Sequence, residues 1–210
     1  MKISKFEHAM LVIDLQGSQL VIDPGSYSNL PKLENVAAVV LTHLHDDHAY
    51  APHIKTITDQ FPDALIFGTL EVANKLEGVK VQVVYHGDRH QIGPFTLDFY
   101  GDLHQVIHRS IPLVQNVGLM VNSTLYYPGD SYTIPEGRVN VLACPSSAPW
   151  LRIADVIDFL EQVKPANCFP THNALLSEQG HNLQNGRIKE IVEKHGGTFR
   201  HLAIGQSWEV

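Results

Sequence analysis

The sequence is poor in cysteine and has no long apolar run. Cys144 and Cys168 are its only two cysteines, which excludes a disulfide framework and predicts two buried thiols. The longest apolar run near the start, residues 9–13, is far too short to cross a bilayer, and no signal-peptide segment precedes it. We therefore expect a cytoplasmic protein that makes no use of a membrane.

Positive charge is also scarce. Lys and Arg number 15 against 22 Asp and Glu, which gives a formal net charge of −7. Such a chain has no general electrostatic attraction for nucleic acid or anionic lipid. We therefore expect a small-molecule substrate, and we do not expect nucleic acid as a partner. The sequence leaves the oligomeric state open.

The overall composition is that of an ordinary globular protein. Apolar residues make up 44% of the chain and charged residues 18%, which excludes long disorder, collagen and a coiled coil. A chain of 210 residues can bury a full core without disulfides. Because no linker, repeat or low-complexity stretch interrupts it, we predict a single domain over residues 1–210.

Short apolar runs separated by turn residues predict many strands and a few helices. A hairpin is expected over 9–14 and 19–23, with its turn at Gly17, and a polar turn through Gly87 should join the strands 79–85 and 95–100. The other expected strands are 36–42, 64–67, 117–121, 125–127, 139–144, 167–169 and 198–204. Helices are expected over 51–60, from the cap Thr69 to residue 76, over 153–163 and around 188–192. Two packed sheets with helices outside, an α+β fold, would account for this pattern.

The strongest local signal is the segment Thr42-His43-Leu44-His45-Asp46-Asp47-His48, which directly follows a predicted buried strand. Its pattern, H-x-H-x-D-H, gathers three imidazoles and a carboxylate, the ligands that Zn²⁺ and similar ions prefer. The alternating His43 and His45 can share one metal, whereas Asp47 and His48 can turn toward a second. The spacing favours Asp47 over Asp46 as the ligand.

Two metal ions need more ligands than this one loop supplies. His104, Asp130 and His172 each lie on a turn just after a predicted strand. Taken singly, each would be an ordinary polar loop residue. Their common placement at strand ends, in this order after the H-x-H-x-D-H motif, predicts that they complete the site.

With these residues, the sequence resembles the metallo-β-lactamase superfamily over nearly its whole length. The H-x-H-x-D-H motif is highly specific, whereas the later single residues are specific by order and context. The resemblance implies a four-layer αβ/βα sandwich with a dinuclear metal site along one edge of the two sheets. The ligands that it implies are His43, His45 and His104 for one metal, Asp47, His48 and His172 for the other, and Asp130 as the bridge.

Three further stretches resemble a narrower group within that superfamily. They are Asp23-Pro24-Gly25, residues 101–108 and Ala148-Pro149-Trp150. These stretches are similar to small bacterial metal-dependent hydrolases related to the L-ascorbate-6-phosphate lactonase. The resemblance implies a substrate that is a small molecule with an ester or lactone bond.

The ligand types also suggest a mechanism. Two divalent ions about 3.5–4 Å apart can share a hydroxide that acts as the nucleophile, because their charge lowers the pKa of water toward about 7. We expect Asp47, Asp130 and His108 to be the catalytic residues. Asp130 would help to position the nucleophile or leaving group, and His108 would act as a proton donor or anion contact. Zn²⁺ is the first choice of metal, and Mn, Fe or Ni also suit these ligands.

Other functions stay open at this point. One is a phosphodiesterase acting on nucleotides or RNA, although the chain shows no basic arm. Another is a non-catalytic metal-binding or ligand-sensing protein, because a complete site does not guarantee turnover. A di-iron oxidoreductase is disfavoured, since the superfamily's di-iron electron-transfer members have an acidic residue at the position of His45 and carry a flavin domain.

Several residues near the motifs have two interpretations each. Arg109 is either an anion contact or a surface residue, His8 either approaches the site or does not, and Trp150 is either a pocket wall or a core residue. The remaining histidines are expected at the surface: His53, His86, His90, His181, His195 and His201.

Overall fold

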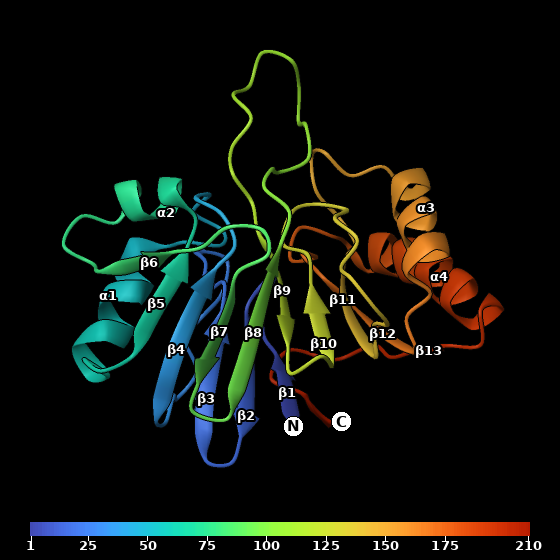
Figure 1. Ribbon diagram of the computed structural model, residues 1–210. Coiled ribbons are helices and arrows are strands. Elements are labelled where there is room, and N and C mark those ends of the chain that lie inside the picture. The colour runs from blue at the N-terminus through green and yellow to red at the C-terminus, as the bar shows by residue number, and fades with distance from the viewer.

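The computed structural model describes residues 1–210 as two β-sheets packed face to face, each covered on its outer side by two helices (Figure 1). The first sheet has the strand order β14-β1-β2-β3-β4-β5-β6, and the second has the order β13-β12-β11-β10-β9-β8-β7. This architecture confirms the expected α+β four-layer sandwich.

The elements have the following bounds. The first sheet contains β1 (Lys2–Lys5), β2 (Leu11–Leu15), β3 (Ser18–Ile22), β4 (Val36–Leu41), β5 (Leu65–Gly68), β6 (Val81–Val83) and β14 (Ser207–Glu209). The second contains β7 (Arg89–Ile92), β8 (Phe95–Tyr100), β9 (Gly118–Val121), β10 (Leu125–Tyr127), β11 (Val141–Pro145), β12 (Asn167–Thr171) and β13 (Thr198–Phe199). The helices are α1 (Ala51–Gln60), α2 (Leu70–Lys75), α3 (Ile153–Val163) and α4 (Glu178–Lys194).

Alternation along the strands divides the apolar residues among three cores. In β2, Leu11 and Ile13 point into a cluster of 23 buried residues between the two sheets, whereas Val12 points to the layer of α1 and α2. In β11, Val141 faces the same central cluster and Leu142 faces α3 and α4. Because successive side chains of a strand point to opposite faces, each sheet can bury both of its sides.

The helices cover the sheets with the apolar faces that the sequence predicts. Ile54 and Ile57 of α1 are buried, and the N-terminus of α2 is capped by Thr69, whose hydroxyl accepts a hydrogen bond from the backbone of Val72. The hairpin of β2 and β3 also forms as expected, and both residues of its two-residue turn, Gln16 and Gly17, have positive φ, as a type I′ turn requires.

The segment expected as a plain polar turn between residues 85 and 95 contains a strand instead, so that expectation is wrong. Arg89–Ile92 forms β7 and pairs antiparallel with β8. Local sequence shows little apolar pattern there, because only Ile92 of this strand is buried. The pairing is stabilised across the sheet by Arg89, whose Nε lies 2.5 Å from Asp98 Oδ1.

Strands at or next to the sheet edges account for the other differences. β1 and β14 were not predicted, and they pair with each other from opposite ends of the chain. The strands expected over 79–85 and 198–204 shrink to Val81–Val83 and Thr198–Phe199. Both of these are edge strands with a neighbour on one side only, so their outer residues have fewer backbone partners to keep them extended.

Strand direction brings four loops to one edge of the sandwich. β10, β11 and β12 are parallel, and β8 runs in the same direction because β8 and β10 are both antiparallel to β9. The loop after β4 reaches this edge from the first sheet, where the carbonyl of Thr42 accepts a hydrogen bond from the backbone of Val117 at 3.0 Å. The turns that follow β4, β8, β10 and β12 therefore meet.

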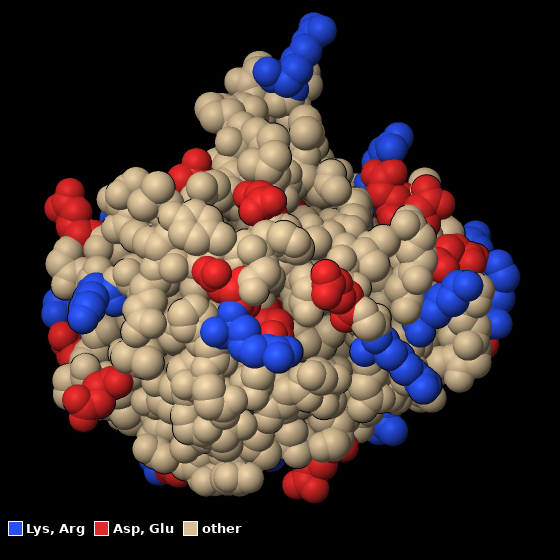
Figure 2. Space-filling model, viewed as in Figure 1, with Lys and Arg blue, Asp and Glu red and all other residues tan.

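The surface shows mixed charge. On the face in Figure 2, Lys and Arg side chains are interspersed with Asp and Glu side chains and form no continuous basic band. The segment that leads from β8 to β9 stands out from the body of the molecule (Figure 1). None of the four helices combines the length and the apolar character that a membrane crossing needs.

The close packing of Gly25, in the turn after β3, leads to a prediction about stability. A Cβ added at Gly25 would lie 1.7 Å from the carbonyl oxygen of Asp47 and 2.6 Å from the backbone nitrogen of His48. Gly25→Ala should therefore displace the loop after β4 and lower the free energy of unfolding by about 2–3 kcal/mol or more, measured by urea denaturation. The matched control is Gly186→Ala in α4, where a Cβ meets nothing within 4 Å, and that variant should gain about 0.5–1 kcal/mol. Equal stability of the two variants would contradict this account of the loop.

Candidate metal centre

Seven titratable side chains gather where the four strand ends meet. They are His43, His45, Asp47 and His48 after β4, His104 after β8, Asp130 after β10 and His172 after β12. All seven are buried or half-buried. The structure therefore brings together every residue that the sequence analysis selected as a metal ligand.

Three imidazoles form one half of this cluster. The ligand atoms of His43, His45 and His104 lie within 4.8 Å of one another. Their ring centroids are 4.8–5.0 Å apart, and the rings meet edge to face. Three nitrogen donors gathered in this way, with a side open to further ligands, are the type of set that holds zinc in catalytic sites.

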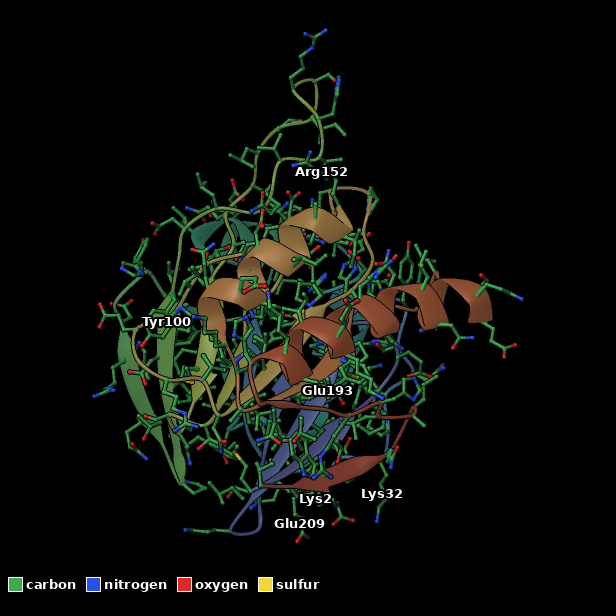
Figure 3. The ribbon with its side chains drawn as sticks, turned by 90° about the vertical axis from the view of Figure 1, so that its right-hand side faces the viewer. Lys2, Lys32, Tyr100, Arg152, Glu193 and Glu209 are labelled. Carbon is green, nitrogen blue, oxygen red and sulfur yellow. The ribbon has the colours of Figure 1, made fainter.

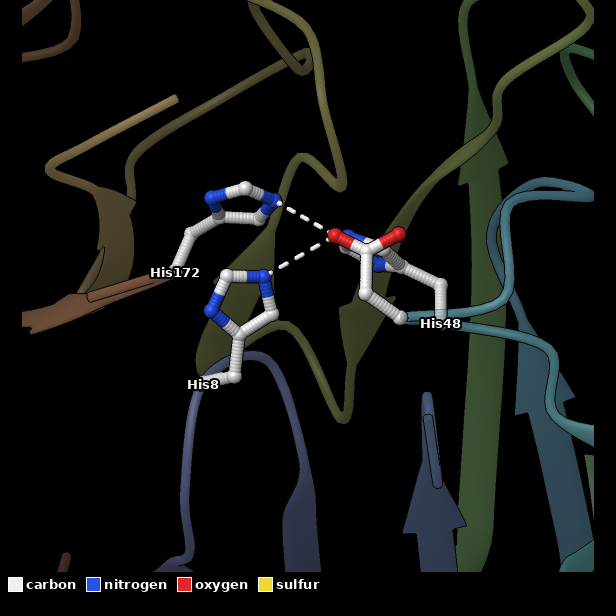
Figure 4. Close-up of side chains that lie close together, drawn as sticks. His8, His48 and His172 are labelled. Atoms are coloured by element: carbon white, nitrogen blue, oxygen red, sulfur yellow. Dashed lines mark hydrogen bonds and ion pairs between the residues drawn. The ribbon is translucent and has the colours of Figure 1, made fainter. Parts of the chain in front are cut away.

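The other half is centred on one oxygen of Asp47. Its Oδ2 lies 3.0 Å from His8 Nε2, 3.4 Å from His172 Nε2 and 3.8 Å from His48 Nε2. Figure 4 shows His8 and His172 pointing to the same carboxylate oxygen from two different segments of the chain. His8 is thus a fourth member of this half. Of its two interpretations, the structure supports the one in which His8 approaches the site.

Asp130 lies between the two halves. Its Oδ1 is 3.2 Å from His48 Nε2, and its Oδ2 is 3.1 Å from His172 Nε2 and 3.4 Å from His104 Nε2. The indole N–H of Trp150 donates a hydrogen bond to Oδ2 at 2.9 Å. Trp150 is buried, so it serves the core and at the same time fixes the carboxylate that touches both halves.

The atoms that face the centre of the cluster lack hydrogen-bond partners. The buried atoms without a partner include Nε2 of His43, His48, His104 and His172 and Oδ1 of Asp130. An unpaired buried polar atom destabilises the folded protein by about 1–3 kcal/mol. Several such atoms at one point therefore indicate a binding site for a ligand or ion. Since imidazole nitrogen and carboxylate oxygen are ligands of Zn²⁺ and similar ions, the residues fit divalent metal.

The opposite ring nitrogens are hydrogen-bonded to the protein, which aims the rings. The partners of Nδ1 are the Thr42 hydroxyl for His43, the Asp23 carboxylate for His48, the Gln105 carbonyl for His104 and the Ser147 carbonyl for His172. An acceptor on Nδ1 places the proton there and leaves the lone pair on Nε2. All four rings therefore aim Nε2 at the centre, and each offers a lone pair to a metal once the ring is neutral.

Asp23 is the residue that sequence reasoning missed. This fully buried carboxylate accepts hydrogen bonds from the Thr42 backbone at 2.8 Å, the Thr42 hydroxyl at 2.6 Å and His48 Nδ1 at 2.7 Å. Because the Thr42 hydroxyl also contacts His43 Nδ1 at 3.0 Å, one anion orients two rings. The sequence contained a signal, because Asp23 directly follows the apolar run of β3. A carboxylate at the end of a buried strand is itself buried only if hydrogen-bond donors surround it.

Backbone strain accompanies this arrangement. His8, Asp23 and His172 have φ values of +56°, +45° and +55°, in the left-handed region that non-glycine residues rarely adopt. Hydrogen bonds hold the strained turns in place, among them the one from the His172 backbone N–H to the His8 carbonyl at 2.8 Å. Such strain persists only where the surroundings impose it, and it concentrates at functional sites.

Burial keeps part of the cluster neutral. It lowers the pKa of His43 well below the usual value, with neighbouring His48 adding to the effect. Burial and the proximity of His104 also lower the pKa of His45. Both rings are therefore uncharged near pH 7 and ready to act as ligands.

Carboxylates keep the other part charged in the metal-free protein. Burial alone would lower the pKa of His172, but Asp130 and Asp47 outweigh it and raise that pKa to about 9. For His48, Asp130 and Asp23 likewise outweigh burial and raise the pKa well above the usual value. Burial alone would raise the pKa of Asp130, yet His172 and His48 hold it well below its usual range. Protons on the two imidazoles thus balance the buried carboxylates, a role that cations could take over.

The structure separates the two aspartates of the motif. Asp46 is exposed and its carboxylate lies 2.6 Å from Lys75 Nζ, so it ties the loop to α2. Asp47 faces the cluster instead. The two neighbouring side chains therefore point in different directions, and only Asp47 is placed to be a ligand.

His108, which was expected to be catalytic, lies away from the cluster, and Arg109 is the surface residue that one of its two interpretations described. His108 and Arg109 are exposed on the segment that stands out from the body, and Nδ1 of His108 lies 2.7 Å from the Ser110 hydroxyl. His104 is at the base of the same segment, but the chain turns outward after it. The catalytic role expected for His108 therefore finds no support in this geometry, because sequence proximity to a ligand does not fix which way a long loop extends.

Comparisons with known proteins agree with the fold. A family model described as "Beta-lactamase superfamily domain" matches residues 2–172. The curated Protein Rv0786c of Mycobacterium tuberculosis is 30% identical over 198 residues, covering 91% of this chain and 93% of that protein. Among solved structures, Igni18, a metallo hydrolase from Ignicoccus hospitalis, has a TM-score of 0.75 at 18% identity, covering 100% of this chain and 98% of that one. The metallo-beta-lactamase fold protein YhfI from Bacillus subtilis has a TM-score of 0.73 at 16% identity, with coverages of 100% and 98%.

Replacing Asp23 tests its role in aiming the rings. Asp23→Asn keeps the size of the side chain but loses an acceptor for Thr42 and His48, so Zn²⁺ affinity should fall about 10–100-fold, as measured by competition with a chromophoric chelator. The matched control is Asp14→Asn, because Asp14 bonds to Gln19 on the same hairpin and not to the cluster. Unchanged affinity in Asp23→Asn would show that Asp23 does not orient the ligands.

Metal uptake should release protons. Since the pKa of His172 in the metal-free protein is about 9, its ring is protonated at pH 7.5 and must lose that proton to become a ligand; His43 is already neutral. Zn²⁺ affinity should therefore increase with pH until about pH 9 and decrease as the pH falls. Calorimetry at pH 7.5 in two buffers of different ionisation enthalpy should give about one or two protons released per chain. Identical heats in the two buffers would contradict the proposed charge balance.

Proposed function

We propose that this chain, which belongs to the metallo-β-lactamase superfamily and is a metal-dependent hydrolase, uses a dinuclear site to hydrolyse an ester or lactone bond of a small molecule. One observation carries the proposal. Four buried imidazole nitrogens and a carboxylate oxygen converge without partners, and they do so at the end of a fold whose relatives include a named metallo hydrolase.

We assign the ligands by the two halves of the cluster. His43, His45 and His104 would hold one ion, and Asp47, His48 and His172 would hold the other. Asp130 would bridge them, because its two oxygens face His48 on one side and His104 and His172 on the other. Zn²⁺ is the proposed metal, since imidazole-rich sets of this kind suit it.

When bound, two such ions lower the pKa of water toward neutrality and polarise the oxygen of a substrate carbonyl. The protein itself supplies orientation. Trp150 and the surrounding histidines fix Asp130, whose low pKa keeps it ionised. The adjacent imidazole of His172 and the hydrogen bond from His8 outweigh burial, lower the pKa of Asp47 and keep it ionised as well. The contacts of Asp47 with the three histidines all use Oδ2, which leaves Oδ1 to accept a hydrogen bond from an attacking water or a leaving group.

A small pocket beside Asp47 limits the substrate. It has a volume of about 250 Å³ and is lined by His8, Tyr27, Asp47, Ser147, Ala148, Pro149, His172 and Leu175. His8, Asp47 and His172 belong to the metal cluster, whereas Ala148, Pro149 and Leu175 supply apolar walls. This composition suits a compact molecule with one polar reacting group, such as an ester or lactone with a short apolar substituent.

Removing one ligand tests the assignment. His48→Ala should lose one of two metal ions, measured by elemental analysis, and its turnover should drop about 100-fold or more. The matched control is His86→Ala. His86 is exposed, and its ring accepts a hydrogen bond from the backbone N–H of Gly101. If His48→Ala kept two ions and normal turnover, the assignment would be wrong.

A substrate panel tests the reaction. The Zn²⁺-loaded protein should hydrolyse lactones and short-chain p-nitrophenyl esters, lose this activity with EDTA and regain it with Zn²⁺. Turnover of bis-p-nitrophenyl phosphate alone would instead establish a phosphodiesterase. Full metal occupancy with no turnover of any of these compounds would point to a metal-binding or ligand-sensing protein.

A further inference from the structure

A second and larger cavity lies outside the metal cluster, between the end of β1, one face of α4 and the segment that follows β13. Its volume is about 870 Å³, within the range of small-molecule sites. In Figure 3, α4 lies across the face turned to the viewer, near the chain ends marked by Lys2 and Glu209. The hydrolytic proposal above makes no use of this cavity.

Lys5 at the end of β1 is a buried cation that borders this cavity. Its side chain is only 2% exposed, and its ammonium donates to the Phe6 carbonyl at 2.9 Å and to Asn173 Oδ1 at 3.3 Å. An ammonium has three N–H donors, so one is left without an acceptor. No carboxylate lies within ion-pair distance of it, and burial lowers its pKa to about 8, although nearby Glu7 acts in the opposite direction.

Two histidines add to this basic group. His181 and His201 line the cavity together with Lys5. Burial lowers the pKa of His181, and the nearby His201 and Lys5 lower it further. Nδ1 of His181 is buried and has no hydrogen-bond partner. The lining also includes Glu7, whose carboxylate accepts hydrogen bonds from Asn29, and the exposed Glu178 and Lys189. Lys5 is therefore the buried cation of this cavity, and the two histidines beside it can add N–H donors.

The face of α4 that borders the cavity is polar, whereas the buried residues of this helix are Ile188 and Val192. It presents Glu178, His181, Asn182, Asn185 and Lys189, which are spaced as neighbours on one side of a helix. The Asn185 amide has a buried oxygen without a partner, and rotation of this amide would offer two N–H donors instead. A helix face built in this way is suited to contact a polar ligand group.

The remaining wall is apolar. Phe199 and Leu202 line the cavity, and Ile204 lies at its margin with 64% of its surface exposed. An exposed isoleucine beside a cavity of this size gains by being covered, because burial of apolar surface is favourable. A ligand that fits this cavity therefore has one negatively charged end and one apolar end.

We propose that this cavity binds a small organic anion, with its carboxylate or phosphate group on Lys5, His181 and His201 and its apolar body against Phe199 and Leu202. The shared chemistry is an oxyanion on a hydrocarbon. His8 and Asn173 form the boundary toward the metal cluster, since His8 lines both this cavity and the small pocket beside Asp47. The cavity adjoins the cluster at His8, but Lys5, His181 and His201 are not among the proposed metal ligands, so binding does not require turnover.

The test uses the ¹⁵N-labelled protein as purified, with and without Zn²⁺, and titrates octanoate, octyl phosphate, inorganic phosphate and octanol. Octanoate, octyl phosphate or both should shift the amide signals of Gly186 and Ala203 with saturable affinity, independently of Zn²⁺. Whichever of these two binds more tightly identifies the anionic group. Inorganic phosphate and octanol should bind at least tenfold more weakly, because each lacks half of the required chemistry.

Two variants locate the site. Lys5→Met and His201→Gln should each weaken binding of the octyl anions, Lys5→Met by about tenfold or more. Lys55→Met is the matched control, since Lys55 is on the other side of the molecule in α1 and pairs with Asp59. His201 is exposed, so its variant keeps the test valid if Lys5→Met does not fold.

Several results would overturn the proposal. One is that octanol binds as tightly as octanoate, which would remove the role of charge. Another is that binding is unchanged in every variant that folds. A third is that the signals shift only at residues 43–48, which would place the anions on the metal cluster, and a fourth is that none of the four probes binds. None of these outcomes bears on hydrolysis, which the substrate panel tests separately.

Discussion

The structure depends on holding unpaired ligand atoms together in the interior. Four imidazole nitrogens and one carboxylate oxygen face a common centre without hydrogen bonds, and burial makes that unfavourable for each of them. The sandwich supplies the needed stability from three apolar cores on both sides of its two sheets. The cluster can therefore remain assembled and unsatisfied at the edge, in readiness for cations.

Fixed partners behind the ligands make the assembly specific. Asp23 orients His43 and His48 through Thr42 and through a direct hydrogen bond, and Trp150 holds Asp130 from the other side. Gly25 lets the same turn pass against the backbone of the ligand loop, where no side chain has room. The turn after β3 thus has a structural task and a chemical one, although none of its residues faces the centre.

His8 connects the two cavities of the molecule. Its ring bonds to Asp47 and packs on His172 with centroids 3.9 Å apart, and it also borders the larger cavity that contains Lys5. The short stretch from Lys5 to His8 therefore contributes to both sites. The two cavities therefore share this segment of the chain, although Lys5 borders only the larger one.

The sequence by itself determined the fold class, most strands and helices, and the seven residues of the cluster. Apolar alternation lies within each strand, and the motif from His43 to His48 lies on one loop. His104, Asp130 and His172 were identified by their places after strands and by the family resemblance. Only the tertiary structure decided the role of Asp23, the place of His8 beside Asp47 and the outward position of His108. It alone also revealed β1 and β14, which pair from opposite ends of the chain. These features depend on contacts between distant segments, and the direction of a side chain or loop is set by neighbours that no local pattern specifies.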